Sequence, residues 1–494
     1  MRLVLFVIIG CGITVQKESE NGDSSIKPSI AIVGAGISGL STARRLIELG
    51  IDDFDIFEGL DRIGGRIHAI PYKDGYLQMG AQFINGADNP LYKIADRLGL
   101  ISYVVSDTAH IDNAKFVYGN YSVNEDDIKL FLEFIQPLDP KYRRIAKYDE
   151  RASRRYTFKE LFTVDYMDFL KKNNITGERK NVFDSLVRSF RSYWEFEWAA
   201  DWSKLSVQVL KEWNDYGREC ESFGTNRIGF KGIIDDIASV IPPNAIKFNT
   251  RVENIALNSD TGKLTITTNK GIVERKYDYV VVTSSLGVLK KYHQTMFTPS
   301  LPRQKIEAIE KIGFGGSCKI FLEWDKPFWS NDTYSIAPLP IKGLGRDHLD
   351  PFEEETTTLQ VVDWAPNVLS AWYAGKGHEV IDNMSEDEIR VRMAKTQLTK
   401  NELLLGSYSY MTQVQALSRI SHSQLAIPVK LDGRPKILFA GEATHHRLFQ
   451  TTIGGYLSGR READRAFSDW KKFEKVGNKK RDTVNCTRIQ TITF

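Results

Sequence analysis

The stretch that decides the fold is "IAIVGAGISGLSTARRLIELG", residues 30–50. Residues 30–33 form a short apolar run, which is typical of a buried strand. Glycines follow at positions 34, 36 and 39, and apolar residues then recur at helical spacing up to Gly50. Residues 53–58, "DFDIFE", have the pattern of a second strand. Strand, glycine-rich turn, helix and strand in this order predict a βαβ unit.

The glycines of this turn have the spacing G-x-G-x-x-G, and each has a physical role. Gly34 permits the tight turn, Gly36 lets a pyrophosphate approach the backbone, and Gly39 lets the helix pack closely on the strand. The helix N-terminus then presents its partial positive charge to the phosphates. Glu58 ends the second strand, where a carboxylate binds a ribose hydroxyl. We therefore predict a dinucleotide site rather than a purely structural glycine turn.

A second glycine pair follows in "RIGGRI", residues 62–67. A loop with Gly65 and Arg66 at this place can lie beside the same diphosphate, and the guanidinium would neutralise its charge. Taken alone, the loop is equally typical of a surface turn with a solvated arginine.

Composition limits the function classes. The 494 residues are enough for more than one compact unit. The 66 basic and 63 acidic residues leave a net charge of +3, which argues against a general nucleic-acid binder. Four cysteines are too sparse for a disulfide framework or a zinc site, so no metal is predicted. Nothing in the sequence indicates an oligomeric state.

Residues 1–18 have the shape of a signal peptide, with Arg2 before an apolar run of about a dozen residues. The run is shorter than the ~20 residues of a membrane-spanning helix, and no membrane span is predicted. A buried N-terminal strand and a lipoprotein box around Cys11 are the alternatives. Five Asn-x-Ser/Thr sites mildly favour a secreted glycoprotein; they lie at Asn120, Asn174, Asn331, Asn383 and Asn485.

One lysine stands in an apolar run, "GFGGSCKIFLEW", residues 313–324. From Cys318 onward the alternation predicts a strand. Lys319 is then either a solvated edge charge, which strands use against mispairing, or a working group beside a glycine-rich turn. The segment alone leaves both interpretations open.

Several segments together resemble the flavin-containing amine oxidases, a superfamily that includes polyamine oxidases, monoamine oxidases, L-amino acid oxidases and histone lysine demethylases. The resemblance covers roughly residues 29–470. It is carried by the opening βαβ unit with "RIGGRI", by "LQMGAQFING" (77–86), by residues 281–329, by "GSYSY" (406–410), and by "FAGEAT" and "TTIGGY" near the end.

The resemblance implies an α/β fold. A Rossmann-like, glutathione-reductase-like FAD-binding domain would be discontinuous, and an α+β substrate domain with a mixed sheet and helices would be inserted into it. We expect the FAD-binding domain over 29–87, 225–290 and 430–470, the substrate domain over 88–224 and 291–429, and a polar tail over 471–494.

FAD is the cofactor that the resemblance implies. It assigns the ADP half to the two glycine motifs, Glu58 and Arg66, the flavin ring to Gly80 and Ala81, and the adenine to the backbone of Val252. It assigns the ribityl or phosphate region to Glu442 and the pyrimidine end to Thr452 and Ile453. The monoamine oxidase subgroup attaches FAD through a cysteine shortly before the last flavin segment, and no cysteine lies between Cys318 and Cys486. We therefore expect noncovalent FAD.

The resemblance also implies the catalytic and substrate residues. Lys319 aligns with a lysine that holds a water at the flavin, and burial there would lower its pKa and suit it to proton handling. Tyr408 would wall the amine site, and Thr452 would lie beside the substrate. Asn85 stands where animal polyamine oxidases tend to have histidine and plant ones glutamate, and asparagine offers hydrogen bonds without charge.

The implied reaction is oxidation of an amine carbon with O₂. Spermine, spermidine or their acetylated forms would give an aminoaldehyde, a shorter amine and hydrogen peroxide. An L-amino acid or other amine oxidase of the same fold is one alternative. A catalytically impaired FAD-binding protein that acts as a binding module is another. Three departures favour the latter: Asn85 offers no charge, Gly454 replaces a histidine, and the segment between Met384 and Leu405 is about 30 residues shorter than usual.

Overall fold

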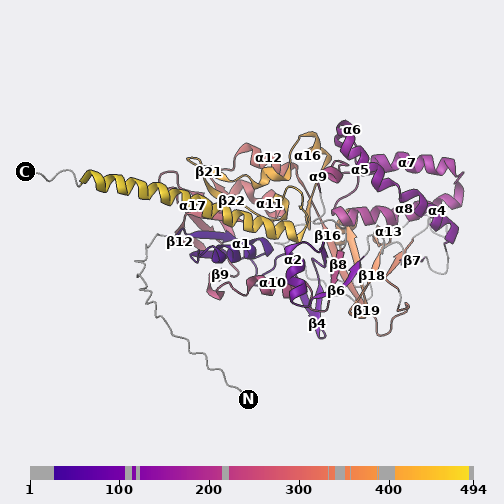
Figure 1. The fold of residues 1–494 in the computed structure, drawn as a ribbon. Helices are drawn as coiled ribbons and strands as arrows, with labels where there is room; N and C mark the ends of the chain where they lie inside the picture. The colour runs from indigo at the N-terminus through magenta and orange to yellow at the C-terminus, as the bar shows by residue number, and fades with distance from the viewer. Residues whose placement is uncertain are drawn as a thin grey trace, which may run out of the picture. The chain divides into compact units, whose positions relative to one another are not determined.

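The computed structural model describes residues 27–105, 114–117, 123–213, 222–331, 333–339, 351–356, 358–385, 388 and 407–488 (Figure 1). Within α17 it describes side chains up to residue 474. Residues Pro28–Lys472 form one compact unit, and Met1–Lys27 with Phe473–Phe494 form a second. The predicted signal peptide, residues 1–18, lies outside the described residues.

A six-stranded sheet carries the opening motif. Its order is β21-β22-β13-β1-β2-β9, with β21 antiparallel to β22 and all other neighbours parallel. The strands are β1 (Ile30–Val33), β2 (Phe54–Phe57), β9 (Ile246–Lys247), β13 (Tyr279–Val282), β21 (Val429–Leu431) and β22 (Arg434–Phe439). With α1 (Ile37–Glu48) between β1 and β2, the predicted βαβ unit is confirmed. The sheet draws its strands from three segments of the chain that lie far apart in sequence.

Both faces of this sheet are buried, as is usual for parallel strands. Ile30 and Ile32 of β1 join a core with α1, α10 (Phe230–Ala238) and α17 (Thr452–Arg488). Ala31 and Val33 join a second core with α11 (Leu286–Met296) and α12 (Arg303–Lys311). This arrangement fixes the carboxyl end of β1, and with it the glycine-rich turn.

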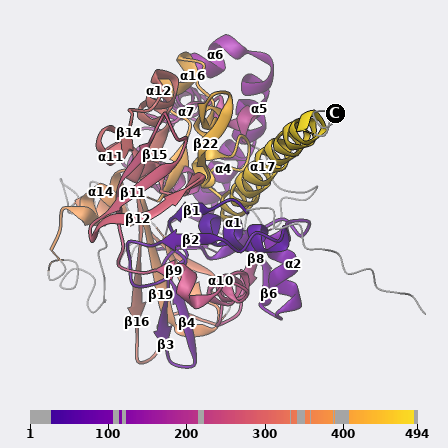
Figure 2. The same cartoon turned by 90° about the vertical axis from the view of Figure 1, so that its left-hand side faces the viewer.

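A five-stranded sheet of order β16-β19-β18-β17-β7 carries Lys319. Its strands are β7 (Ala114–Val117), β16 (Ser317–Glu323), β17 (Ser335–Pro338), β18 (Leu359–Val362) and β19 (Ala365–Ala374). One face is apolar and packs against α13 (Pro351–Glu355) and α14 (Lys376–Asp382). On the other face, α8 (Gly177–Trp198) packs against β19. The long strands β16 and β19 also run beside the hairpin of β3 (Ala69–Tyr72) and β4 (Gly75–Gln78) (Figure 2).

Several helices gather in one region of the structure (Figure 1). Aromatic and aliphatic side chains pack into one core there. These helices are α4 (Glu125–Ile135), α5 (Leu138–Tyr148), α6 (Glu150–Arg155), α7 (Phe158–Lys172), α8 and α9 (Val209–Glu212).

The remaining elements complete the fold. A three-stranded sheet joins β5 (Phe83–Asn85), β8 (Ser222–Thr225) and β6 (Ile101–Val105), and a four-stranded sheet joins β12 (Gly271–Tyr277), β11 (Leu264–Thr268), β10 (Val252–Leu257) and β14 (Phe297–Thr298). β15 (Gly313–Gly315) pairs with β20 (Tyr408–Tyr410). The short helices are α2 (Pro90–Arg97), α16 (Gln413–Leu417), η1 (Pro243–Ala245), η2 (His422–Ala426) and η3 (Glu442–Thr444).

The α/β class with a mixed second sheet and helices is thus confirmed. The expected polar tail over 471–494 is helical at its start, because α17 continues to Arg488. Straight-chain residues such as Lys, Arg and Glu dominate residues 471–481, and these residues have high helix propensity even where there is no apolar stripe. Within the described residues, no helix is both long and apolar enough to cross a membrane.

Candidate active site

A single large cavity of about 1940 Å³ connects the glycine-rich turn with the face of the five-stranded sheet that carries Lys319. The predicted site residues that line it are Gly34, Gly36, Glu58, Gly65, Arg66, Gly80, Ala81, Asn85, Val252, Lys319, Tyr408, Glu442, Thr452 and Ile453. Gly39 is the one predicted residue that does not line it. Residues more than 400 positions apart in the sequence therefore face one space.

The three glycines of the turn differ in their surroundings. A Cβ on Gly39 would lie 1.9 Å from the backbone oxygen of Gly34, so a side chain there would force α1 away from β1. A Cβ on Gly36 would meet only the oxygen of Gly64, at 3.9 Å, and would otherwise project into open space. The loop with the second glycine pair lies against this turn, because the Gly64 N–H donates to Ala35 O at 2.9 Å. Gly36 thus borders a space that a ligand can enter.

Glu58 is buried, and its carboxylate is fixed by two backbone N–H groups. Oε2 accepts from Ala35 N at 2.6 Å and Oε1 accepts from Leu60 N at 2.8 Å. Burial raises the pKa of Glu58 above its ordinary value, and the two backbone donors oppose this rise. The carboxylate is held at the cavity wall beside the glycine turn.

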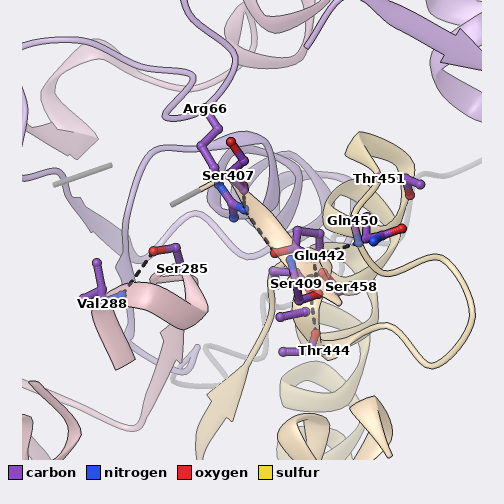
Figure 3. A network of polar contacts seen from close by, with 12 residues as sticks. Arg66, Ser285, Val288, Ser407, Ser409, Glu442, Thr444, Gln450, Thr451 and Ser458 are labelled. Atoms are coloured by element: carbon purple, nitrogen blue, oxygen red, sulfur yellow. Dashed lines mark hydrogen bonds and ion pairs between the residues drawn. The ribbon is translucent and has the colours of Figure 1, made fainter. Parts of the chain in front are cut away.

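Arg66 and Glu442, which the resemblance assigned to separate roles, are each other's partners (Figure 3). The guanidinium Nη1 donates to Glu442 Oε1 at 3.0 Å and to the backbone oxygen of Ser407 at 2.6 Å. The other carboxylate oxygen of Glu442 accepts from the Ser409 hydroxyl at 2.7 Å and from Gln450 N at 2.8 Å. Glu442 thereby connects the second glycine loop, β20 and the turn before α17.

Three helices begin at the cavity wall. α1 follows Gly36 directly, Ser285 caps α11 by accepting from Val288 N at 3.3 Å, and α17 begins at Thr452. The hydroxyl of Thr451 accepts from Gly454 N at 3.0 Å in the first turn of α17. Helix N-termini carry partial positive charge, so this part of the cavity favours an anionic ligand such as a diphosphate.

Lys319 is buried, with 3% of its surface exposed, although β16 is an edge strand. The solvated edge-charge interpretation is therefore wrong. Three acceptors surround its Nζ: Gln78 O at 2.7 Å, Gly80 O at 3.3 Å and Gln82 Oε1 at 2.7 Å. Every acceptor in this set is neutral.

Burial lowers the pKa of Lys319 well below its ordinary value. No carboxylate among the described residues forms an ion pair with it, because its partners are two backbone oxygens and an amide. A neutral amine with a free lone pair can accept a proton from a bound molecule. The lowered pKa makes Lys319 a candidate base next to Gly80, where the resemblance expects the flavin ring.

Aromatic rings surround this amine. Lys319 Nζ lies 3.8 Å from the ring centroid of Trp372, its cross-strand partner on β19. Phe196 of α8 packs edge-on against Trp372 with centroids 4.6 Å apart. The hydroxyl of Tyr408 donates to the backbone oxygen of Phe196, which fixes the tyrosine ring between β20 and α8. Burial raises the pKa of Tyr408 well above its ordinary value, and the charge of Glu197 adds to this rise.

Three of these groups were not anticipated from the sequence: Gln82, Trp372 and Glu197. Gln82 lies within "LQMGAQFING", so the motif predicted that it would lie near the flavin but did not predict its contact with Lys319. Trp372 could be found only by knowing the register of β16 against β19. Glu197 lines the cavity near Tyr408, and a carboxylate on an aromatic helix gave no local signal.

Of the departures from the family pattern, the structure explains Gly454 but does not describe most of the shortened segment. A Cβ on Gly454 would lie 1.9 Å from the backbone oxygen of Leu448, so this backbone has no room for the expected histidine. The glycine is therefore required by the local structure. The shortened segment between Met384 and Leu405 lies almost entirely outside the described residues.

Comparison with known proteins agrees with this geometry. The chain is 27% identical to the peroxisomal N(1)-acetyl-spermine/spermidine oxidase of Bos taurus, over 90% of this chain and 95% of that protein. It is 25% identical to polyamine oxidase 1 of Oryza sativa subsp. japonica, over 90% and 98% of the two chains. Wild-type putrescine oxidase bound to putrescine has a similar fold, with a TM-score of 0.64 at 16% identity, over 90% and 99% of the two chains.

A family model described as flavin containing amine oxidoreductase matches residues 37–466, which is most of the chain. The glycine turn, the carboxylate at the end of β2 and three helix N-termini on one cavity fit the FAD that this family uses. The chain belongs to the flavin-containing amine oxidoreductase family, and its cofactor is FAD.

Proposed function

We propose that this protein is a polyamine oxidase that takes spermine, spermidine or their acetylated forms. With O₂ as acceptor, the products are an aminoaldehyde, a shorter amine and hydrogen peroxide. The observation that carries the proposal is Lys319: a buried amine with neutral partners, surrounded by aromatic rings, on the same cavity as the FAD motif.

The cofactor residues in this proposal are those that the resemblance implies, and all of them except Gly39 line the cavity. Gly34, Gly36, Gly65, Glu58 and Arg66 hold the ADP half, while Gly39 holds α1 against β1. Gly80 and Ala81 approach the flavin ring, Val252 the adenine, Glu442 the ribityl region, and Thr452 and Ile453 the pyrimidine end.

FAD is bound noncovalently in this proposal. Cys318 lines the cavity, but burial raises the pKa of its thiol far above the ordinary value, which makes it a poor nucleophile. Acid precipitation should therefore leave all of the flavin in the supernatant.

When bound, FAD supplies the two-electron oxidation of the carbon–nitrogen bond and returns the electrons to O₂. The chain's own residues prepare the amine for this. Lys319 Nζ holds or accepts a proton, and its low pKa keeps it neutral enough to do so. Tyr408, Trp372 and Phe196 exclude water and orient the amine. Asn85 can hydrogen-bond a neutral or charged amine, and the carboxylate of Glu197 favours a cationic substrate.

L-amino acid oxidases need an arginine for the carboxylate of the substrate. The arginines among the described cavity residues all have acidic partners: Arg66 with Glu442, Arg143 with Asp139, and Arg251 with Glu253. This pairing favours a polyamine over an L-amino acid.

We also propose that the protein is secreted, on the basis of residues 1–18. The glycosylation sites at Asn174, Asn331 and Asn383 lie at exposed positions, which leaves them accessible. Expression in a secretory host, followed by N-terminal sequencing of protein from the medium, tests this. An uncleaved chain retained in the cells would contradict it.

The function is tested by product analysis. Purified protein is incubated in air with spermine, spermidine, their N-acetylated forms and a panel of L-amino acids. We expect peroxide and an aminoaldehyde only from the polyamines. Peroxide from an amino acid would instead support the related L-amino acid oxidase activity, and a flavoprotein inert to every amine would support the binding-module alternative.

A further inference from the structure

The face of the five-stranded sheet that presents Lys319 to the cavity also carries a row of uncharged polar side chains. Strand pairing places Ser370 of β19, Gln360 of β18 and Ser335 of β17 next to one another across the sheet. Lys319 and Trp372 form the adjacent cross-strand pair on the same face, two residues along β16 and β19. Because side chains alternate along a strand, all five project to one side.

This arrangement is unusual because the row is buried. Ser335 and Ser370 are each 1% exposed, and Gln360 is 7% exposed. On the opposite face, the alternate residues Ile320, Leu369 and others form an ordinary apolar core. A buried hydroxyl without a hydrogen-bond partner costs free energy that an apolar side chain at the same place would avoid.

Several polar atoms in this row lack a partner within the described part of the chain. They are Ser335 Oγ, Ser370 Oγ and Trp372 Nε1. The Nε2 of Gln360 donates a hydrogen bond to the hydroxyl of Tyr334 at 2.9 Å, and this bond orients the Gln360 carboxamide. Ser335, Gln360, Tyr334 and Trp372 all line the cavity. Ser370 does not line it. Buried polar groups are nearly always satisfied in native proteins, so the unpaired Ser335 Oγ and Trp372 Nε1 on the cavity wall indicate a missing ligand.

The row contains no carboxylate. Asp363, in the turn between β18 and β19, is exposed and does not line the cavity. An ammonium group placed over Ser335 and Gln360 would lose its hydration without gaining a counter-ion. A secondary amide fits the same groups: its carbonyl accepts from a serine hydroxyl, and its N–H donates to the Gln360 carboxamide oxygen.

We propose that the part of this row that lines the cavity, Ser335 and Gln360, is a subsite for the neutral N-acyl end of the substrate. The inference rests on the proposed function and narrows it to N-acylated amines. From strand spacing, the Cα atoms of Gln360 and Lys319 are roughly 12 Å apart. The reacting amine lies at Lys319, and the acyl group lies along the sheet toward β17.

The test is the ratio of kcat/KM for an N-acetylated polyamine to kcat/KM for the same polyamine without the acetyl group. The holoenzyme is used throughout. The ratio does not depend on how much of a variant is folded. The wild-type protein should prefer the acetylated substrate by at least tenfold. Ser335→Ala and Gln360→Leu should each reduce the preference about five- to tenfold, the usual effect of one lost buried hydrogen bond.

Three further variants sharpen the test. Thr333→Ala removes a buried hydroxyl just before β17, in a residue that hydrogen-bonds Ser330 and does not line the cavity, so the preference should stay unchanged. Ser335→Thr keeps the hydroxyl and should keep the preference. Ser335→Asp supplies a counter-ion and should shift the preference toward the unacetylated amine.

Failure of the subsite proposal and failure of the proposed function give different results. Oxidation of both substrates with equal kcat/KM, or a ratio that Ser335→Ala and Gln360→Leu leave unchanged, overturns the subsite and leaves the proposed function intact. If no amine is oxidised, the proposed function fails. The subsite is then tested by the change in flavin absorbance on binding N-acetylspermine, which Ser335→Ala should weaken about five- to tenfold. An unaltered dissociation constant would overturn it.

Discussion

Replacing Gln82 by glutamate tests the role of Lys319 through one atom. Gln82 Oε1 lies 2.7 Å from Lys319 Nζ, and glutamate of the same length places a negative charge there. Burial alone now lowers the pKa of the lysine. A carboxylate at this distance stabilises the protonated amine and therefore raises the pKa again.

The expected shift of the pH–rate profile follows from the charge of the new carboxylate and its distance from Lys319 Nζ. The neutral amine predominates above its pKa, so the rate falls as the pH drops through that value. An opposite charge within about 4–6 Å moves such a titration upward by about 1–3 pH units. The acidic limb of the pH–rate profile should move up by that amount. At a fixed pH below both limbs, flavin reduction should be about 10- to 1000-fold slower.

The assay is stopped-flow flavin reduction between pH 5 and 10. The same polyamine is used for every variant, so the titration of the substrate affects all profiles equally. Gln82→Leu removes the acceptor without adding charge, and its acidic limb should not move upward. Gln136→Glu adds the same charge at an exposed position of the cavity wall, and should leave the profile unchanged. If Gln82→Glu has the wild-type profile, Lys319 is not the proton acceptor of the reductive step.

Four substitutions test the framework of the site. Gly36→Ala should leave the thermal stability of the apoprotein unchanged but weaken FAD binding. Gly39→Ala should destabilise the apoprotein by about 1–3 kcal/mol through overpacking. Equal effects of the two substitutions in calorimetry would refute these two roles. Gly454→Ala should also lower the free energy of unfolding by about 1–3 kcal/mol, because its Cβ would meet a backbone oxygen. An unchanged melting temperature would show that the start of α17 can relax. Glu442→Ala should lower stability by about 2 kcal/mol and reduce flavin content, since its ion pair is only partly exposed. Unchanged flavin content would separate Glu442 from the cofactor site.

The fold could be predicted where the signal is local. The strand, turn and helix over residues 30–50 follow from apolar spacing and glycine placement, and the structure has β1 and α1 there. The alternation from Cys318 also predicted β16. The helix over residues 471–488 was missed because it has no apolar stripe to indicate its length.

The contacts that complete the site could not be predicted, because they join distant segments. Arg66 and Glu442 are 376 positions apart, so no spacing rule brings them together. The burial of Lys319 depends on which strand covers it and on which face α8 packs. The polar row on the sheet needs the register of three strand pairs, and the sequence does not show which strands pair with one another.

The most direct test of the central claim is an anaerobic titration of the purified flavoprotein followed by its visible spectrum. The protein should be yellow as isolated, and a stoichiometric amount of N-acetylated spermine or spermidine should bleach it fully. Admission of air should restore the colour and release one peroxide for each amine oxidised. A yellow protein that no polyamine bleaches would contradict the account.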